Sequence, residues 1–358
     1  MGRRGRRRAV SPRSPVWAKV LVGTGAVLMT ASMVTVGYTK MMLDKVNDSV
    51  HSKDLLGNSG GGGDIKGPLN FLMIGTDQRV GSKAEARTDS IMVLHVNSSL
   101  TEATIVSIPR DLRVEIANCG TLFSSPCQTK INDAYPAGGP SVEGSVSNLA
   151  ETVTHLTGVS FDGAAIVNFE GFLDVVKTLG SVELCLPMEM TPAHAKGQTF
   201  PKGCNDYGYA DALGIVRERY AYDPTNPEFD PSWGIGDYGR QHMQQHFVKQ
   251  LLKRAAEKGY LSDPTKVGDL IARIGDQLTL DLGGHTPVDF AFALRGIKPE
   301  ALATVKIPSE PADIEGVSYV VTQPGEQQET ADRLYEAIRS DDLDKWIPEN
   351  NEWVNKDD

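Results

Sequence analysis

Arginine and aspartate residues recur in short groups along this chain, each beside an apolar run or at the head of a helical pattern. The groups are Gly75–Arg79, Arg87–Asp89, Ser107–Asp111, Lys130–Tyr135, Val216–Arg219 and Gly236–Arg240. Arginine binds phosphate oxygens in pairs, whereas carboxylates approach phosphate when a hard cation such as Mg²⁺ lies between them. A cleft holding both residue types therefore suits a diphosphate with its metal, and it can neutralise charge during phosphoryl transfer.

The elements around these groups predict an α/β fold with a mixed central sheet covered by helices on both faces. Apolar runs predict strands over 70–75, 91–97, 103–108, 164–168 and 182–186, and helical spacing predicts helices over 142–156, 169–179, 237–258, 287–295 and 330–340. Three of the charged groups lie at strand ends. Ligands of α/β proteins commonly bind at such an edge, so we expect the charges to converge there.

Simpler interpretations exist for each residue taken singly. A lone Arg–Asp pair at a strand end is usually a surface ion pair of little energetic weight. His242 and His246 have a spacing that suits metal ligands, but no Glu or third ligand stands nearby, and a solvated helix face is the favoured interpretation. The sequence contains no Walker phosphate loop, H-E-x-x-H pair or G-x-S-x-G elbow.

The N-terminal region predicts a membrane anchor. Residues 1–19 carry basic side chains and no acid, which predicts a cytoplasmic tail. Residues 20–39 contain no charge and are long enough to cross a bilayer core of about 30 Å as a single transmembrane helix. A cleaved signal peptide is one alternative, but no good small-x-small cleavage site follows the run. A basic nucleic-acid arm over the N-terminal residues is the other. We therefore expect a single-pass protein of the cell membrane whose folded part lies outside the cell.

Three further segments follow the predicted anchor. Residues 40–67 lack apolar periodicity and include a glycine run, which predicts a flexible Gly/Ser-rich stalk. Residues 68–345 are the predicted extracytoplasmic domain, and 346–358 a polar C-terminal tail. The net charge is −10 although the N-terminal tail is strongly basic, so the remainder is acidic. This charge argues against nucleic acid as a partner.

Four cysteines fit an oxidising exterior, where disulfides persist. Neither close pair has the C-x-x-C spacing of a zinc site. Two local bridges are favoured, Cys119–Cys127 and Cys185–Cys204, although four cysteines allow three pairings.

The charged motifs together resemble the LytR-CpsA-Psr family. The similar segments are NFLMIGTDQR, RTDSIMVLHV, SIPRDLRVEI, KINDAYPAGG, ALGIVRERY and GDYGRQHMQQHF, over about residues 68–260. SIPRD together with K-I-N-x-A-Y is the most specific part. The resemblance implies an α/β/α domain with an apolar pocket for a polyprenyl pyrophosphate lipid. It also implies transfer of the lipid-linked glycopolymer phosphate onto peptidoglycan, at the 6-hydroxyl of N-acetylmuramic acid.

The resemblance also assigns roles to matching residues. It implies that Asp77 and Asp89 hold Mg²⁺ and that Asp237 orients Arg240. Asp111 becomes a candidate for taking the acceptor proton, with Arg110 and Asp89 beside it as catalytic groups. The implied pyrophosphate-binding residues are Arg87, Arg110, Lys130, Arg217, Arg219, Arg240 and Gln244.

The chain departs from the family pattern at two places, and other functions remain open. Met243 stands where the family usually has a second arginine, and a Pro-rich loop with Trp233 is inserted between Arg219 and Asp237. A polyprenyl pyrophosphate hydrolase that recycles the lipid carrier is an alternative enzyme. A membrane-anchored regulator or lipid-binding protein is the non-enzymatic alternative, although the short cytoplasmic tail has no helix-turn-helix pattern. The sequence does not name the glycopolymer.

Overall fold

The computed structural model describes residues 51–57, 64–76, 88–120, 126–193, 197–230, 233–260, 266, 270 and 278–355. The predicted cytoplasmic tail, the predicted transmembrane helix and much of the predicted stalk lie outside these residues. Within the described ranges, no helix has the length and apolar character needed to cross a membrane.

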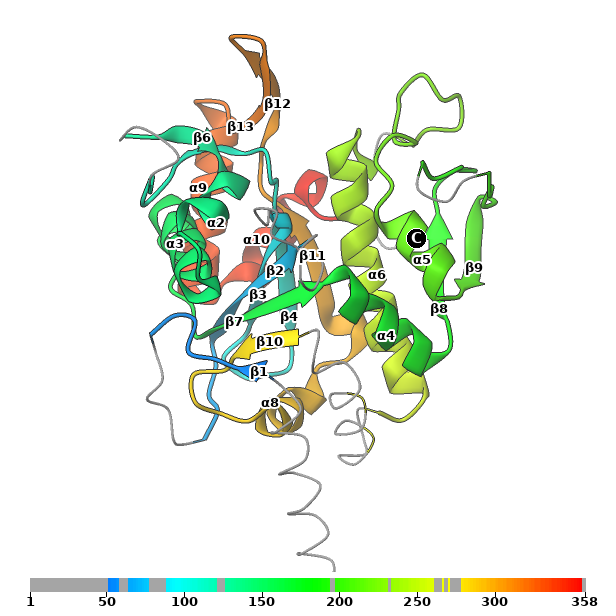
Figure 1. The fold of residues 1–358 in the computed structure, drawn as a ribbon, viewed down its shortest axis with the longest axis horizontal. Coiled ribbons are helices and arrows are strands. Elements are labelled where there is room, and N and C mark those ends of the chain that lie inside the picture. Colours follow the sequence, from blue (N-terminus) through cyan, green and yellow to red (C-terminus); the bar gives the residue numbers. More distant parts are fainter. Residues whose placement is uncertain are drawn as a thin grey trace, which may run out of the picture. The chain divides into compact units, whose positions relative to one another are not determined.

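A seven-stranded mixed sheet forms the centre of the folded unit (Figure 1). In spatial order its strands are β1 (His51–Ser52), β10 (Leu278–Asp281), β7 (Gly163–Asn168), β2 (Leu69–Thr76), β3 (Thr88–Val96), β4 (Ala103–Ile108) and β11 (Leu302–Lys306). β2, β3 and β4 are antiparallel neighbours, whereas β7 pairs parallel with β2 and β11 pairs parallel with β4. The C-terminal ends of β2, β4, β7 and β11 therefore meet the start of β3 at one end of the sheet, the C-terminal edge.

Helices cover both faces of this sheet (Figure 1). One face packs against α2 (Ala134–Ala137), α3 (Val142–Thr157), α9 (Glu326–Ser340) and α10 (Leu343–Glu349), and the other against α6 (Asp237–Glu257) and α8 (Pro287–Ala293). α4 (Phe169–Leu179) follows β7 and contacts α5 and α6. Side chains of β2 point to both faces of the sheet and so contribute to both helix layers. Leu72 and Ile74 belong to the core on the first face, whereas Leu69 and Phe71 belong to the core on the second. The predicted mixed sheet with helices on both faces is confirmed.

Smaller elements surround the central layers. β8 (Val182–Leu186) and β9 (Gly203–Tyr207) form their own two-stranded sheet, which packs with α5 (Tyr209–Val216) beside α6. β5 (Arg113–Glu115) pairs with β6 (Gln128–Lys130), and β12 (Glu310–Ile314) with β13 (Val317–Val321). Single 3₁₀ turns occupy Ile131–Asp133, Leu294–Gly296, Pro299–Ala301 and Asn351–Trp353.

The predicted stalk over 40–67 is wrong for residues 51–57. β1 adds a parallel strand to β10, and Leu55 is buried in the core. Asp281 Oδ2 accepts the backbone N–H groups of Leu55 (2.8 Å) and Leu56 (2.9 Å), so a buried carboxylate fixes the turn after β1. A two-residue strand is too short to produce an apolar period, so the sequence pattern could not reveal it.

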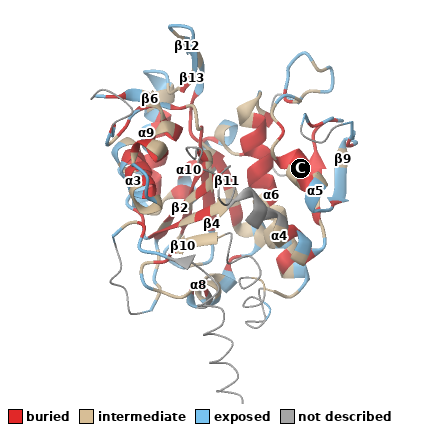
Figure 2. Ribbon diagram, in the orientation of Figure 1, coloured by how far each residue is buried: buried red, intermediate tan, exposed pale blue. Residues whose placement is uncertain are grey.

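The predicted polar tail over 346–358 is wrong up to residue 355. Trp346 belongs to the buried core, and Val354 makes a β-bridge with Val305 of β11. Asn355 donates its amide to Gln245 on α6. Figure 2 shows α10 beside the sheet, and its buried residues are Leu343 and Trp346. The charged residues between these anchors gave the segment its polar appearance in the sequence.

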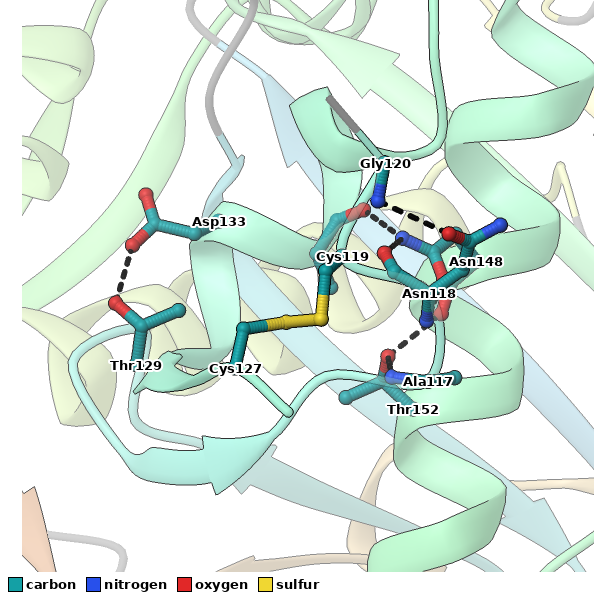
Figure 3. Close-up of a disulfide and its surroundings, with 10 residues drawn as sticks. Ala117, Asn118, Cys119, Gly120, Cys127, Thr129, Asp133, Asn148 and Thr152 are labelled. Carbon is teal, nitrogen blue, oxygen red and sulfur yellow. Dashed lines mark hydrogen bonds between the residues drawn. A yellow bond between two sulfur atoms is a disulfide. The ribbon is translucent and has the colours of Figure 1, made fainter. Parts of the chain in front are cut away.

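Both local disulfide pairings are present in the structure. Cys119–Cys127 closes the loop before β6, and Cys185–Cys204 joins directly opposed residues of β8 and β9. Around the first bridge, Asn148 of α3 accepts the Asn118 N–H at 2.9 Å and donates to the Asn118 carbonyl at 2.9 Å (Figure 3). The bridge therefore fixes the entry to β6, the strand that ends in Lys130.

Candidate active site

The C-terminal edge brings charged side chains of β3 and of the loop after β4 together. Asp89 is the second residue of β3, and Arg110 and Asp111 follow β4 after Pro109. Arg110 Nη1 donates to Asp89 Oδ1 at 2.6 Å, and Arg110 Nε lies 3.7 Å from Asp111 Oδ2. Antiparallel pairing of Ile91 with Ile108 places these groups side by side. Their convergence, expected from the strand-end pattern, is thus observed.

The first turn of α6 completes this network. Arg240 Nη2 lies 2.7 Å from Asp237 Oδ1 one helical turn away, and it donates to the Asp89 backbone carbonyl at 3.1 Å. Arg110 Nε is 3.7 Å from the same Asp237 oxygen. Asp237 therefore bridges the two arginines and holds Arg240 over the sheet end, the orienting position expected for it.

Lys130 enters from β6 on the other side of Asp111. Its Nζ lies 2.9 Å from Asp111 Oδ1 and 5.8 Å from the centre of the Tyr319 ring. The β12–β13 hairpin reaches this position because Val320 N donates to the Asp111 carbonyl at 2.9 Å. Tyr319 is a neighbour that sequence reasoning missed, since residues 262–358 lay outside the motifs that resembled the family.

The loop after α5 carries Arg217 and Arg219 and is wound around a buried carboxylate. Glu218 is 1% exposed, and its Oε1 accepts the backbone N–H groups of the next three residues at 2.5–3.1 Å. Its Oε2 accepts the Ala193 N–H at 2.6 Å. Arg217 is the C-cap of α5 at the start of this loop. Glu218 stands between the two predicted arginines, and no sequence signal marked it as their organiser.

Like charges are concentrated at this edge. Burial lowers the pKa of the Arg240 guanidinium; Arg110 and Arg219 lower it further, whereas Asp237 and Asp89 oppose them. A side-chain hydrogen bond with Tyr220 raises the pKa of Arg219, and Asp237 and Asp89 add to that effect. Arg219 is thus electrostatically coupled to the same carboxylates as Arg110 and Arg240.

Several buried polar atoms here have no hydrogen-bond partner within the described part of the chain. They include Nε of Arg110 and of Arg240, Oε1 of Gln244 and Oγ1 of Thr88. Buried polar atoms in folded proteins are nearly always paired, so an orphaned donor needs an explanation. Two guanidinium N–H groups at one buried site suit the oxygens of an anionic ligand.

The fit to a magnesium ion depends on residues beyond this network. The described residues hold no group of three or more His, Cys, Asp or Glu side chains arranged around a metal position. Mg²⁺ usually takes one or two carboxylates and fills its shell with phosphate oxygens and water. Asp89 can supply one such oxygen. Asp77, the expected second ligand, lies outside the described residues, as does Arg87.

Other predicted positions on α6 have structural rather than site contacts. Met243 is fully buried in the core formed with β8 and α5, so it does not replace an arginine at the network. The solvated face suggested for His242 and His246 is wrong, because both are buried. His242 stacks on Trp233 with ring centroids 3.9 Å apart, and His246 Nε2 accepts the Cys185 N–H at 3.1 Å.

An apolar strip runs along the sheet face that α6 covers. Met73, Ala165 and Leu280 lie in register on β2, β7 and β10, and each is only half-buried. On the opposite face of β2, Leu72 and Ile74 are almost completely buried. The strip therefore has apolar side chains that neighbouring helices do not fully cover, three residues from the end of β2.

Comparison with known proteins identifies the family. The model of the LytR_cpsA_psr family matches residues 31–336. This chain belongs to that family. The probable cell wall biosynthesis protein LcpB of Corynebacterium glutamicum is 28% identical over 306 residues, which cover 81% of this chain and 65% of LcpB. A Bacillus licheniformis protein, polyisoprenyl-teichoic acid–peptidoglycan teichoic acid transferase TagU, is 31% identical over 60% of each chain.

A solved structure supports the fold. Bacillus subtilis TagV superposes with a TM-score of 0.61 at 20% identity, covering 77% of this chain and 98% of TagV. The chain spans 60–65% of the length of the two curated relatives above. The LytR_cpsA_psr chain described here therefore shares its fold with TagV.

Proposed function

We propose that this protein is a phosphotransferase that moves a glycopolymer from a polyprenyl pyrophosphate lipid onto peptidoglycan. The observation that carries the proposal is the pair of guanidinium groups of Arg110 and Arg240, whose buried Nε–H groups have no hydrogen-bond partner among the described residues. TagU, a relative of the same family, is named for a polyisoprenyl-linked donor and a peptidoglycan acceptor. The arrangement at the C-terminal edge suits that chemistry.

The network supplies binding and charge neutralisation. Its described part contains four cations (Arg110, Lys130, Arg219 and Arg240) and three carboxylates (Asp89, Asp111 and Asp237). A diphosphate that accepts the arginine Nε–H groups would meet a partly buried, preorganised set of donors. Such donors stabilise negative charge in a transition state without reorganising during the reaction.

The reaction we propose is a single displacement at phosphorus. A sugar hydroxyl of the wall attacks the polymer-side phosphorus, and a new P–O bond forms. The bond from that phosphorus to the bridging oxygen breaks, and polyprenyl phosphate leaves. Arg110 and Arg240 hold the diphosphate, and Asp111, fixed by Lys130, is the candidate for receiving the hydroxyl proton. Mg²⁺ bound through Asp89 and Asp77 would neutralise further phosphate charge.

The apolar strip is the proposed seat of the lipid chain. Met73, Ala165 and Leu280 offer partly exposed apolar surface on the sheet face that carries α6, close to the charged edge. Burial of this surface by a polyprenyl chain would be favourable by about 25 cal/mol for each Å² removed from water. Residues 20–39 are the proposed anchor, which would keep the domain outside the cell and beside its membrane-borne donor.

An acceptor-dependence assay tests the proposal. The full-length protein in lipid vesicles is given a glycosylated polyprenyl pyrophosphate with and without peptidoglycan fragments, and the products are identified by mass spectrometry. We expect covalent glycan–peptidoglycan conjugates and polyprenyl phosphate. Release of polyprenyl phosphate with no conjugate at any acceptor concentration would assign the protein to the hydrolase class instead.

A further inference from the structure

The inserted loop between Arg219 and α6 is firmly anchored. Trp233 is 2% exposed and stacks on His242 with an interplanar angle of 14°. Tyr222 is buried in the same core. A Cβ atom added to Gly239 would lie 2.2 Å from the Tyr222 ring, so this ring rests directly on the backbone of α6, one residue before Arg240. The loop is thus an integrated part of the fold beside the charged network.

The two ends of this loop are held together. Gly236 N donates to the Tyr222 carbonyl at 2.8 Å, and Glu218 winds the first residues of the loop around its carboxylate. The two ends of the loop therefore lie close together in space, one after Arg219 and the other before Asp237. Tyr220 directly follows Arg219 in the chain, and Ile235 lies two residues before Asp237.

These ends expose two large apolar side chains. Tyr220 is 63% exposed and Ile235 is 53% exposed, although most such residues elsewhere in the described chain are buried. The Arg219 guanidinium carbon lies 4.8 Å from the centre of the Tyr220 ring, and Arg219 Nη2 donates to the Tyr220 hydroxyl at 2.7 Å. Exposed apolar groups fixed beside a charged site commonly mark a binding surface.

We infer that Tyr220, with Ile235, forms a sugar subsite that receives the pyranose ring next to the reacting phosphate. The apolar C–H face of a pyranose suits the electron-rich face of an aromatic ring, and Arg219 is placed to contact the attached phosphate. This inference rests on the proposed function, because it names the part of the substrate that lies beside the diphosphate. The sugar belongs to either the donor or the acceptor.

Binding measurements test the subsite without depending on turnover. Full-length protein in detergent is titrated with a hexose 1-phosphate and, separately, with inorganic phosphate, by calorimetry. Tyr220→Ala should weaken hexose 1-phosphate about fivefold relative to inorganic phosphate, the usual size of one aromatic contact. Tyr220→Phe keeps the ring and loses only the hydroxyl that Arg219 contacts, so it should change both affinities together and preserve their ratio.

Tyr209→Ala is the matched control. Tyr209 is also exposed (46%), and Lys177 Nζ lies 4.9 Å from its ring centre, but it begins α5 rather than the inserted loop. This variant should leave the affinity ratio unchanged. An unchanged ratio in Tyr220→Ala would overturn the subsite, as would an equal loss in Tyr209→Ala.

Turnover assays then assign the sugar and separate the two hypotheses. If Tyr220→Ala raises the KM for a glycosylated lipid pyrophosphate but leaves the KM for sugar-free lipid pyrophosphate unchanged, the donor sugar binds at Tyr220. A raised KM for peptidoglycan fragments alone places the acceptor sugar there. If the wild-type protein cleaves neither lipid, the proposed function fails, and the binding ratio still decides whether the subsite exists.

Discussion

Replacing Arg110 by alanine removes the side chain that joins three carboxylates. In the structure its guanidinium donates to Asp89 at 2.6 Å and lies 3.7 Å from both Asp111 and Asp237. Each carboxylate keeps another cation after the change, because Arg240 remains 3.9 Å from Asp89 and 2.7 Å from Asp237, and Lys130 remains 2.9 Å from Asp111. We therefore expect Arg110→Ala to fold.

The expected losses in stability and activity differ in size. Arg110→Ala removes partly exposed ion pairs whose carboxylates each keep another cation, so the net loss should be about 1 kcal/mol, which lowers Tm by a few degrees in a domain of this size. Loss of a charged donor from the reacting phosphate should lower kcat by about 10²–10³-fold, or about 3–4 kcal/mol of transition-state stabilisation. Arg110→Lys keeps the charge without the planar fork, and it should recover only part of that loss.

Release of polyprenyl phosphate from a lipid-linked donor measures the activity, and circular dichroism with thermal melting measures folding. Both variants and the wild type are assayed as full-length protein in vesicles. A folded Arg110→Ala protein with wild-type kcat/KM would refute the placement of the diphosphate at this network. If Arg110→Ala lowers activity and Tm together, and assaying at a lower temperature restores the activity, Arg110 has only a structural role.

Three further outcomes follow from the structure. Glu218→Ala should raise the donor KM at least tenfold, because four backbone N–H groups lose a buried acceptor and the loop that carries Arg217 and Arg219 rearranges; Glu218→Gln should recover part of this loss in the same kinetic assay. Asp341 accepts His95 Nε2 and Ser98 N, both at 2.9 Å. Burial alone would raise the pKa of the Asp341 carboxyl, but these hydrogen bonds hold it below its usual value. The resulting stability is present above the unfolded pKa of about 3.9 and is lost as the pH falls through the lower folded pKa. Denaturant unfolding should therefore show Asp341→Asn less stable than wild type at neutral pH, with a gap that closes in acid. Chelation of divalent cations should abolish transfer, and added Mg²⁺ should restore it; activity that survives chelation would remove the metal from the mechanism.

Local signals in the sequence were enough for the centre of the fold and for half of the site. β2, β3 and β4 are continuous apolar runs, and the residues at their ends could converge only at one edge of a sheet. Arg110 and Asp89 were therefore predictable as neighbours. The helical period likewise marked α6, and with it the position of Arg240.

Contacts between distant segments were not predictable. β1 is too short for a period, and β11 pairs with β4 across almost two hundred residues of chain, which local pattern cannot encode. Glu218 was overlooked because a charged residue between two arginines is expected at the surface. In the structure it is buried, and its carboxylate accepts hydrogen bonds from four backbone N–H groups. Tyr319 reaches Lys130 only because a late hairpin pairs with the loop after β4.

The contact of Asn355 with Gln245 has a practical consequence for anyone preparing this protein. Gln245 also donates to the carbonyls of Ile105 and Val305 and to the Ser107 hydroxyl, so one amide ties α6 to two strands and to the last described residue. The polar composition after residue 345 suggests that the chain could be truncated there. Truncation would remove the hydrogen bond from Asn355 to Gln245 and so destabilise α6, the helix that carries Arg240. Expression clones should keep this segment, and purification tags are better placed elsewhere.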